Sequence, residues 1–171
     1  EQLAEYIRGV GSWNLFSRPD IGIKKIKLSD GPHGMRTEPD KKKNDKVIFA
    51  PTYKAVCYPS MSLTACSFNR DLVRELGENL ADEAKHLGVH VILGPAVNIK
   101  RDPLCGRNFE YISEDPYLVG ELATSYIAGT QSKGIGTSIK HFACNNCETD
   151  RMIVNSVVDE RALREIYLAG F

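Results

Sequence analysis

The chain has 171 residues, of which 22 are basic and 22 acidic, so it carries no formal net charge. Hydrophobic residues make up 42% and charged residues 26% of it, which is typical of a globular protein. The length is that of about one domain. The even charge balance argues against nucleic-acid or membrane-surface binding, and no apolar run reaches the roughly 18 residues of a membrane-spanning helix.

The first third of the chain contains one short strand pattern and one irregular stretch. Residues 23–28 (IKKIKL) have the composition of a short strand. Residues 37–54 show no periodicity and are predicted to form a loop excursion. The lysines at 41–43 lie in this stretch and are interpreted as a solvated charge run.

Three later segments have apolar residues at helical spacing, and each has a recognisable boundary residue. Gly88 follows the first segment as a stop, Asp115 precedes the second as an N-cap, and Asp159 precedes the third in the same role. The predicted helices are residues 69–87, 116–131 and 160–171.

Two continuous apolar runs, residues 89–97 and 135–143, separate these helices. Such runs are typical of parallel strands that are covered on both faces. The order helix, strand, helix, strand, helix predicts an α/β fold built from βα units with right-handed crossovers. We expect residues 1–171 to belong to a single domain.

Polar side chains gather directly after each predicted strand, at residues 29–34, 101–115 and 140–151. The carboxyl ends of parallel strands open on one face of the fold, and in α/β proteins that face carries the active site. We therefore expect the three clusters to form one shared site.

The ionisable residues of these clusters suit an uncharged polyol. A carboxylate can accept hydrogen bonds from two neighbouring hydroxyls, while arginine, lysine and histidine donate to hydroxyl oxygens. The sequence has no Gly-rich phosphate loop, no complete set of zinc ligands and no Gly-x-Ser-x-Gly motif, so we expect no cofactor and no metal. The candidates are Asp30, Arg107, Lys140, His141, Glu148 and Arg151, with Arg36 and Arg101 nearby.

Each candidate also has a purely structural interpretation, which the residues alone leave open. Asp30 lies in a Ser-Asp-Gly-Pro sequence that forms turns readily. Lys140 and His141 are neighbours in a predicted strand, where adjacent side chains point to opposite faces, and they could form internal hydrogen bonds instead. Arg107 and Arg151 could pair with acidic residues, of which Glu110, Glu114 and Glu148 are available.

The cysteines indicate a reducing compartment. Their number, five, is odd, which is typical of free thiols and favours a cytoplasmic location. Cys144 and Cys147 form a C-x-x-C pair, but no second pair completes a zinc site, and we interpret them as incidental small side chains.

Four longer motifs closely resemble glycoside hydrolase family 3, with the best match to its β-glucosidases. They are LSDGPHGMR at 28–36, YPSMSLTACSFN at 58–69, LGPAVNIKRDPLCGRNFEYISEDP at 93–116 and KHFACNNCETDR at 140–151. The resemblance runs in order over residues 11–171. It implies that the chain is the amino-terminal half of a (β/α)8 TIM-like barrel, which this chain leaves incomplete because such a barrel takes about 250 residues.

The resemblance also implies roles for five candidates in binding the terminal glucose unit of a substrate. Asp30 would take the hydroxyls at C4 and C6. Arg107, Lys140 and His141 would hold those around C3 and C4. Arg151 would lie lower, toward the C2 hydroxyl and the reacting carbon. The sequence ACNN after the KHF motif differs from the family's N-acetylglucosaminidase branch and favours a glucosidase.

The activity implied by the resemblance is that of a retaining β-glucosidase, which releases terminal non-reducing β-D-glucose from a β-glucoside or a short β-glucan oligosaccharide. The family's nucleophilic Asp and acid/base Glu would lie beyond Phe171, so we expect the chain alone to be inactive. The rest of the barrel and a C-terminal domain would be supplied in cis or by a second chain.

Two alternatives remain at this point. One is another exo-glycosidase of the family, such as a β-xylosidase; the contact of Asp30 with the C6 hydroxyl would separate it from a glucosidase, because xylose lacks that hydroxyl. The other is a non-catalytic sugar-binding or assembly fragment that docks on another chain.

Overall fold

The computed structural model describes residues 4, 6, 8–38 and 52–171. The lysines at 41–43 and most of the predicted excursion lie outside these residues. In chain order the elements are β1 (Gly9–Val10), β2 (Asn14–Leu15), η1 (Pro19–Ile21), β3 (Leu28–Ser29), α2 (Met61–Ala65), α3 (Arg70–His86), β4 (Val91–Ile92), η2 (Asn108–Glu110), α4 (Pro116–Ser132), β5 (Gly136–Thr137), α5 (Glu160–Ala162) and η3 (Leu163–Tyr167).

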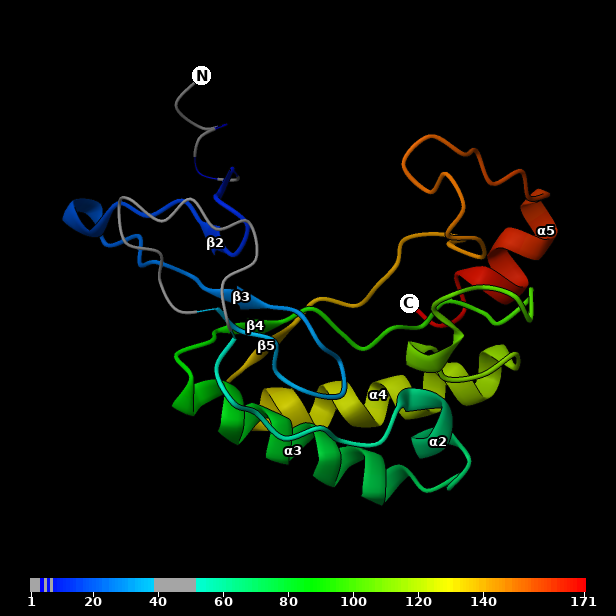
Figure 1. Ribbon diagram of the computed structural model, residues 1–171, viewed down its shortest axis with the longest axis horizontal. Coiled ribbons are helices and arrows are strands. Elements are labelled where there is room, and N and C mark those ends of the chain that lie inside the picture. The colour runs from blue at the N-terminus through cyan, green and yellow to red at the C-terminus, as the bar shows by residue number, and fades with distance from the viewer. Residues whose placement is uncertain (1–3, 5, 7, 39–51) are drawn as a thin grey trace.

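Three parallel strands form one sheet in the order β3–β4–β5. Leu28 pairs with Val91, and Ile92 pairs with Thr137. β1 and β2 form a separate antiparallel pair near the N-terminus. Helices alternate with the three parallel strands along the chain, so the predicted α/β fold is confirmed (Figure 1).

β3 begins later than the strand predicted at residues 23–28. Upstream of β3, Ile23 and Lys27 form antiparallel bridges with Arg18 and Asn14. This stretch is therefore tied to the N-terminal segment rather than to the main sheet, and only its end enters the parallel ladder.

β4 and β5 are shorter than the strands predicted at residues 89–97 and 135–143. Pro95 has no N–H to donate to a ladder, and regular pairing stops before it. Beyond the proline, parallel pairing resumes only as a bridge at Lys140. Because β5 ends before Lys140, the alternation of side chains along a strand does not decide to which face the side chains of Lys140 and His141 point.

The first two predicted helices are confirmed, and so are their boundaries. Asn69 Oδ1 accepts hydrogen bonds from two backbone N–H groups in the first turn of α3, and Gly88, with a φ of +67°, follows its end. Asp115 Oδ1 accepts a hydrogen bond from the backbone N–H of Tyr117 at the start of α4.

The third predicted helix starts where expected but ends early. Asp159 caps α5 by accepting from the backbone N–H of Ala162, and the helix continues as the π-helical η3 only to Tyr167. The chain then passes close to α4, where a Cβ on Gly170 would lie 2.9 Å from Val119 Cγ1. The five-residue helix α2, which the sequence pattern did not predict, is too short to show a helical period.

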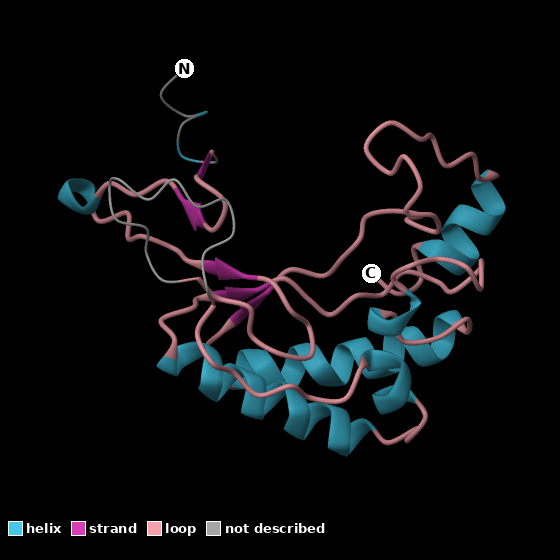
Figure 2. Cartoon of the chain, viewed as in Figure 1, coloured by secondary structure: helices cyan, strands magenta, loops and turns pink. Residues whose placement is uncertain are grey.

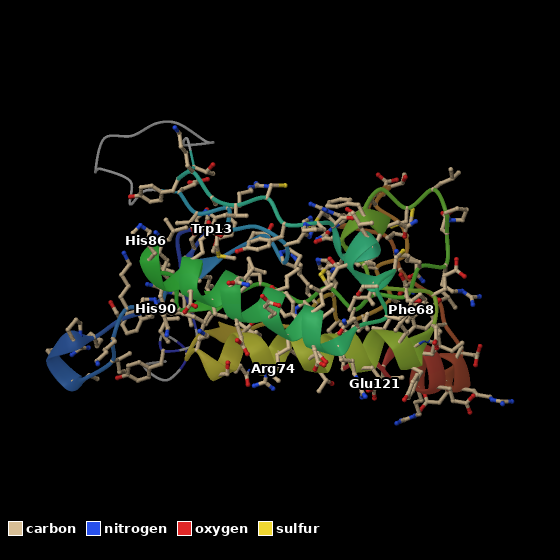
Figure 3. All side chains as sticks on the ribbon, turned by 90° about the horizontal axis from the view of Figure 1, so that it is seen from below. Trp13, Phe68, Arg74, His86, His90 and Glu121 are labelled. Atoms are coloured by element: carbon tan, nitrogen blue, oxygen red, sulfur yellow. The ribbon has the colours of Figure 1, made fainter. Side chains whose placement is uncertain are left out.

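α3 and α4 lie side by side along one side of the sheet, and long loops lie on the other (Figures 1 and 2). Figure 3 follows α3 from Phe68, next to its start, to His86 at its end. None of the helices in the described part of the chain is long and apolar enough to cross a membrane. The core between helices and sheet includes Val73, Leu80, Ile92, Leu122 and Tyr126.

Two glycines allow the backbones of α3 and α4 to approach closely. A Cβ on Gly129 would lie 2.1 Å from the carbonyl oxygen of Arg74, and one on Gly77 would lie 2.5 Å from that of Tyr126. Any side chain at either position would collide with backbone of the other helix. This contact fixes the helix pair that supports the sheet from one side.

Candidate functional site

The predicted site residues come from the loops that follow the parallel strands. Asp30 comes directly after β3, and Lys140 lies three residues after β5. Arg107 is in the long connection between β4 and α4, immediately before η2. Since the strands are parallel, all three loops leave the same edge of the sheet.

A chain of ion pairs joins these three loops. Asp30 Oδ1 lies 2.8 Å from Lys140 Nζ, and the same ammonium lies 3.6 Å from Glu110 Oε2. The other carboxylate oxygen of Glu110 accepts a hydrogen bond from Arg107 Nε. Residues from the β3, β4 and β5 loops therefore contact one another directly, as the positions of the three clusters predict.

Glu148 extends this chain of ion pairs to the last of the predicted residues. Its Oε1 lies 3.7 Å from Arg107 Nη1, and its Oε2 accepts a 2.6 Å hydrogen bond from Arg151 Nη1. Asn145 Nδ2 donates to the same carboxylate at 2.7 Å. Glu148 thus holds both arginines, and it is one of the three acidic residues that the structural interpretation of the arginines named.

His141 joins the cluster through uncharged partners. Its Nδ1 lies 3.4 Å from the hydroxyl of Tyr111, and the two rings meet edge to face. Asn145 Nδ2 donates to the same hydroxyl at 3.0 Å. Through Asn145 and Glu148, His141 belongs to the same network as the charged residues.

A second layer of amides fixes the loop that carries Asn145. The side-chain oxygen of Asn98 accepts from the backbone N–H of Asn145 at 2.8 Å, and its amide donates to Asn146 Oδ1 at 2.8 Å. Asn146 in turn donates to the hydroxyl of Tyr167 at 2.9 Å. The 145–148 loop is therefore held between the β4 loop and η3.

Two carboxylates of the cluster, Asp30 and Glu148, are kept ionised by their partners. Partial burial raises the pKa of Asp30, but the hydrogen bond and charge of Lys140 outweigh burial and leave this pKa below its usual value. Burial likewise raises the pKa of Glu148, but hydrogen bonds from Asn145 and Arg151 outweigh it and lower the pKa overall. Both groups are therefore acceptors at neutral pH rather than acids.

The histidine and the tyrosine are kept neutral. Burial, helped by the charges of Arg107 and Lys140, lowers the pKa of His141 to about 4. Burial raises the pKa of Tyr111 to about 12. The cluster then contains three carboxylates and three cations, which sum to zero charge, together with neutral donors and acceptors. Such a set is suited to an uncharged polyol, as the sequence predicts.

A pocket of about 750 Å³ opens beside this cluster. Asp30, Arg107 and Arg151 line it, together with Glu110 and Arg36. The rings of His33 and Phe109, in edge-to-face contact at 5.7 Å, are also part of its wall. Lys140 and His141 are not among the lining residues. Lys140 contacts the lining residues Asp30 and Glu110 directly, whereas His141 is linked to the pocket only indirectly, through Tyr111, Asn145 and Glu148.

All five residues predicted to bind the ligand are thus brought into one network. Tyr111 and Asn145 were not predicted as site residues from the sequence, and Glu110 was predicted only as a structural partner for an arginine. Their signal was position: Glu110 is three residues after Arg107, and Asn145 stands in the polar stretch after β5. Nothing in a single sequence showed which of the acidic residues pairs with which cation.

The cysteine pair has no partner in this network. All five cysteines are free thiols; Cys144 is buried and Cys147 exposed. Within the described residues no group of three or more His, Cys, Asp or Glu side chains could hold a metal ion. The cytoplasmic location stays a prediction.

Parallel strands that alternate with helices and collect polar groups at their carboxyl ends place the chain in the α/β class of folds, to which (β/α) barrels belong. Residues 52–171 match the model of the glycosyl hydrolase family 3 N terminal domain. The chain belongs to glycoside hydrolase family 3, and its fold is the amino-terminal part of the family's barrel, as the motifs predict.

Individual relatives agree with this assignment. The chain is 48% identical over 173 residues to thermostable beta-glucosidase B of Acetivibrio thermocellus, covering 100% of this chain and 22% of the relative. It is 44% identical over 171 residues to an exo-alpha-(1->6)-L-arabinopyranosidase of Bifidobacterium longum, with coverage of 100% and 22%. The solved beta-glucosidase 3B of Thermotoga neapolitana, in complex with alpha-D-glucose, is 48% identical with a TM-score of 0.82, covering 92% of this chain and 21% of that one. The chain thus spans about a fifth of these proteins.

Proposed function

We propose that the protein to which this sequence belongs is a retaining β-glucosidase, which releases terminal β-D-glucose from the non-reducing end of a β-glucoside or a short β-glucan. The observation that carries the proposal is the charge-neutral cluster beside the pocket, where Asp30, Lys140, Glu110, Arg107, Glu148 and Arg151 form one connected set. The names of two relatives, both β-glucosidases, support glucose as the sugar.

In this proposal the side chains share the hydroxyls of the glucose ring among them. Asp30 accepts from the hydroxyls at C4 and C6, since its carboxylate is ionised, lines the pocket and is a third exposed. Arg107, Lys140 and His141 hold the hydroxyls around C3 and C4. Arg151, also on the pocket wall, lies toward C2 and the reacting carbon.

The two catalytic carboxyl groups belong, in the same proposal, to parts of the protein outside this sequence. Retaining hydrolysis needs a nucleophile and an acid about 5–5.5 Å apart, and the acid needs a raised pKa. In this chain Asp30 and Glu148 have lowered pKa values, and the Glu110 carboxylate is occupied by Arg107 and Lys140. None of the three is suited to protonate a leaving group. The rest of the barrel and a C-terminal domain would supply the pair.

The first test replaces the carboxylate that faces the pocket. In the full-length enzyme, Asp30→Ala leaves the sugar hydroxyls without an acceptor and the Lys140 ammonium without its nearest counter-charge. We expect kcat/KM for an aryl β-glucoside to fall by about 10²–10⁴-fold, the equivalent of several kcal/mol of transition-state binding. Asp82→Ala, which removes an exposed carboxylate on α3, is the matched control and should keep wild-type kinetics. An unchanged kcat/KM for Asp30→Ala would overturn the role of this residue.

A second candidate activity is hydrolysis of pentopyranosides. The similarity to an exo-alpha-(1->6)-L-arabinopyranosidase favours it. A pentopyranose lacks the C6 hydroxyl, which is one of the two hydroxyls that Asp30 is proposed to bind. Aryl β-glucoside, β-xyloside and α-L-arabinopyranoside should therefore be compared in one assay. A glucosidase prefers the glucoside, and Asp30→Ala reduces that preference. A wild-type enzyme that prefers either pentoside would identify this second activity instead.

A further inference from the structure

Glu110 is a buried carboxylate that holds two cations from different loops. It lies at the end of η2, and its side chain is only 6% exposed. One oxygen accepts from Arg107 Nε, within the β4 loop, and the other lies 3.6 Å from Lys140 Nζ, in the β5 loop. A buried carboxylate in this position neutralises both cations and restrains both side chains.

The ammonium of Lys140 lies between two carboxylates of unequal exposure. Asp30, at 2.8 Å, has a side chain that is 33% exposed, whereas Glu110 is almost fully buried. Asp30 is therefore free to accept further hydrogen bonds from a ligand in the pocket. Glu110 holds the ammonium from the protein interior, and the direction of the remaining N–H bonds of Lys140 depends on both contacts.

Arg107 is constrained in a similar way. Its Nε is bound to Glu110, and its Nη1 lies 3.7 Å from Glu148. The guanidinium is planar and rigid, so fixing Nε sets the directions of its other donors. Burial lowers the pKa of Arg107, but the hydrogen bond and charge of Glu110 outweigh burial and raise it overall.

We propose that Glu110 is a positioning residue for recognition of the sugar: through Arg107 and Lys140 it sets the donors that meet the hydroxyls at C3 and C4. The inference rests on the proposed β-glucosidase function and adds a residue that lies at the pocket wall but acts through its two cations. Its own carboxylate is already occupied by the two cations.

Glu110→Gln in the full-length enzyme tests this, because the amide keeps the shape of the side chain and an acceptor for Arg107 but loses the charge. Without that charge, the two cations repel each other and the Lys140 ammonium moves toward Asp30. We expect kcat/KM for an aryl β-glucoside to fall about 10- to 100-fold, mostly through a higher KM, which is the range for losing hydrogen bonds to charged groups. Glu114→Gln, at an exposed position in the same loop, should retain wild-type values.

Substrates that lack single hydroxyls separate positioning from folding. For the 3-deoxy and 4-deoxy aryl glucosides, we expect Glu110→Gln to cost less than about 3-fold relative to the wild type on the same substrate, because the contact it supports is already missing. An equal loss on all three substrates, or no loss on any, would contradict the proposal.

A double-mutant cycle with Lys140→Gln tests separately whether Glu110 acts through Lys140. The double variant has no unpaired ammonium, and if Glu110 acts through Lys140, Glu110→Gln should cost much less in the Lys140→Gln background than in the wild type. Additive losses would overturn the mechanism. Binding of glucose to the wild type is measured in parallel by calorimetric titration. A wild type that neither hydrolyses the glucoside nor binds glucose would refute the β-glucosidase proposal itself. An active wild type with an unaffected Glu110→Gln variant would refute only the role of Glu110.

Discussion

His141 has a protonation state that depends on its neighbours. Burial and the charges of Arg107 and Lys140 lower its pKa to about 4 in the folded protein. In an unfolded chain the pKa of a histidine side chain is about 6.5, which is well above this folded value. At neutral pH the ring is therefore uncharged, and it can share a hydrogen bond with the hydroxyl of Tyr111 or with a sugar.

This difference predicts a pH-dependent stability. Between about pH 6.5 and about pH 4 the unfolded state binds a proton that folded His141 does not, so stability falls as the pH drops through this interval. We expect the Tm of the full-length protein to fall more steeply over this range than that of His141→Gln, as measured by scanning calorimetry. His86→Gln, at an exposed position at the end of α3, should follow the wild type. If the Tm of the wild type and that of His141→Gln fell equally steeply with pH, the lowered pKa of His141 would be contradicted.

The charged residues of the site were predictable as a group but not as pairs. Residue type and position after a strand selected six candidates, Asp30, Arg107, Lys140, His141, Glu148 and Arg151. The family resemblance then implied sugar-binding roles for all of them except Glu148. Their partners are set by contacts between distant parts of the chain; Asp30 and Lys140, for example, are 110 residues apart. The structural interpretation of the arginines is confirmed, because Arg107 and Arg151 are paired with glutamates. Both also line the pocket, and their role in binding a sugar stays a prediction.

The helix pair α3–α4 determines how the sheet is supported, and its close contact depends on glycine. Both helices were predictable to within a residue or so, because caps and apolar spacing are local signals. The close approach at Gly77 and Gly129 was not, since each glycine meets backbone of the other helix. The strands, by contrast, are much shorter than their apolar runs, because Pro95 and the N-terminal segment interrupt the ladder.

A single methyl group tests the helix contact. In Gly129→Ala the new Cβ would meet the carbonyl oxygen of Arg74 at 2.1 Å, and the helices must move apart. We expect a destabilisation of about 1–3 kcal/mol, as for overpacking in general. Thermal or urea unfolding of the full-length protein measures it.

Gly120→Ala is the matched control within the same helix. There the nearest atom, the carbonyl oxygen of Ala169, would lie at an ordinary 3.6 Å, so the change should be neutral or slightly stabilising because alanine favours a helix. If Gly129→Ala were equally well tolerated, the close contact would not limit the packing of α3 against α4.

The described elements form successive βα units of a barrel, with the polar cluster at the carboxyl edge and the helices on the outside. Asp30 and Glu148, whose pKa values are lowered, are acceptors in this cluster rather than acids. In the proposed function, recognition of the sugar belongs to this part of the protein and cleavage of its bond to another part.

Expression of residues 1–171 alone checks this division. We expect no hydrolysis of an aryl β-glucoside above background at any pH from 4 to 8, whereas the full-length protein is active in the same assay. Adding the remainder of the protein as a second polypeptide should restore activity if the two parts assemble. Hydrolysis by residues 1–171 alone would show that the catalytic pair lies among the carboxylates of this chain.

The sequence by itself determined the order of the elements, the ends of α3 and α4, the family, and the set of polar residues that follow the strands. These features depend on neighbours a few positions apart, or on long contiguous motifs. Only the tertiary structure decided where the strands stop, how closely α3 and α4 approach, and that Glu110 and Glu148 each hold two cations. Those outcomes depend on backbone contacts and charge pairs between residues that are mostly distant in the chain. Local sequence patterns do not predict such contacts.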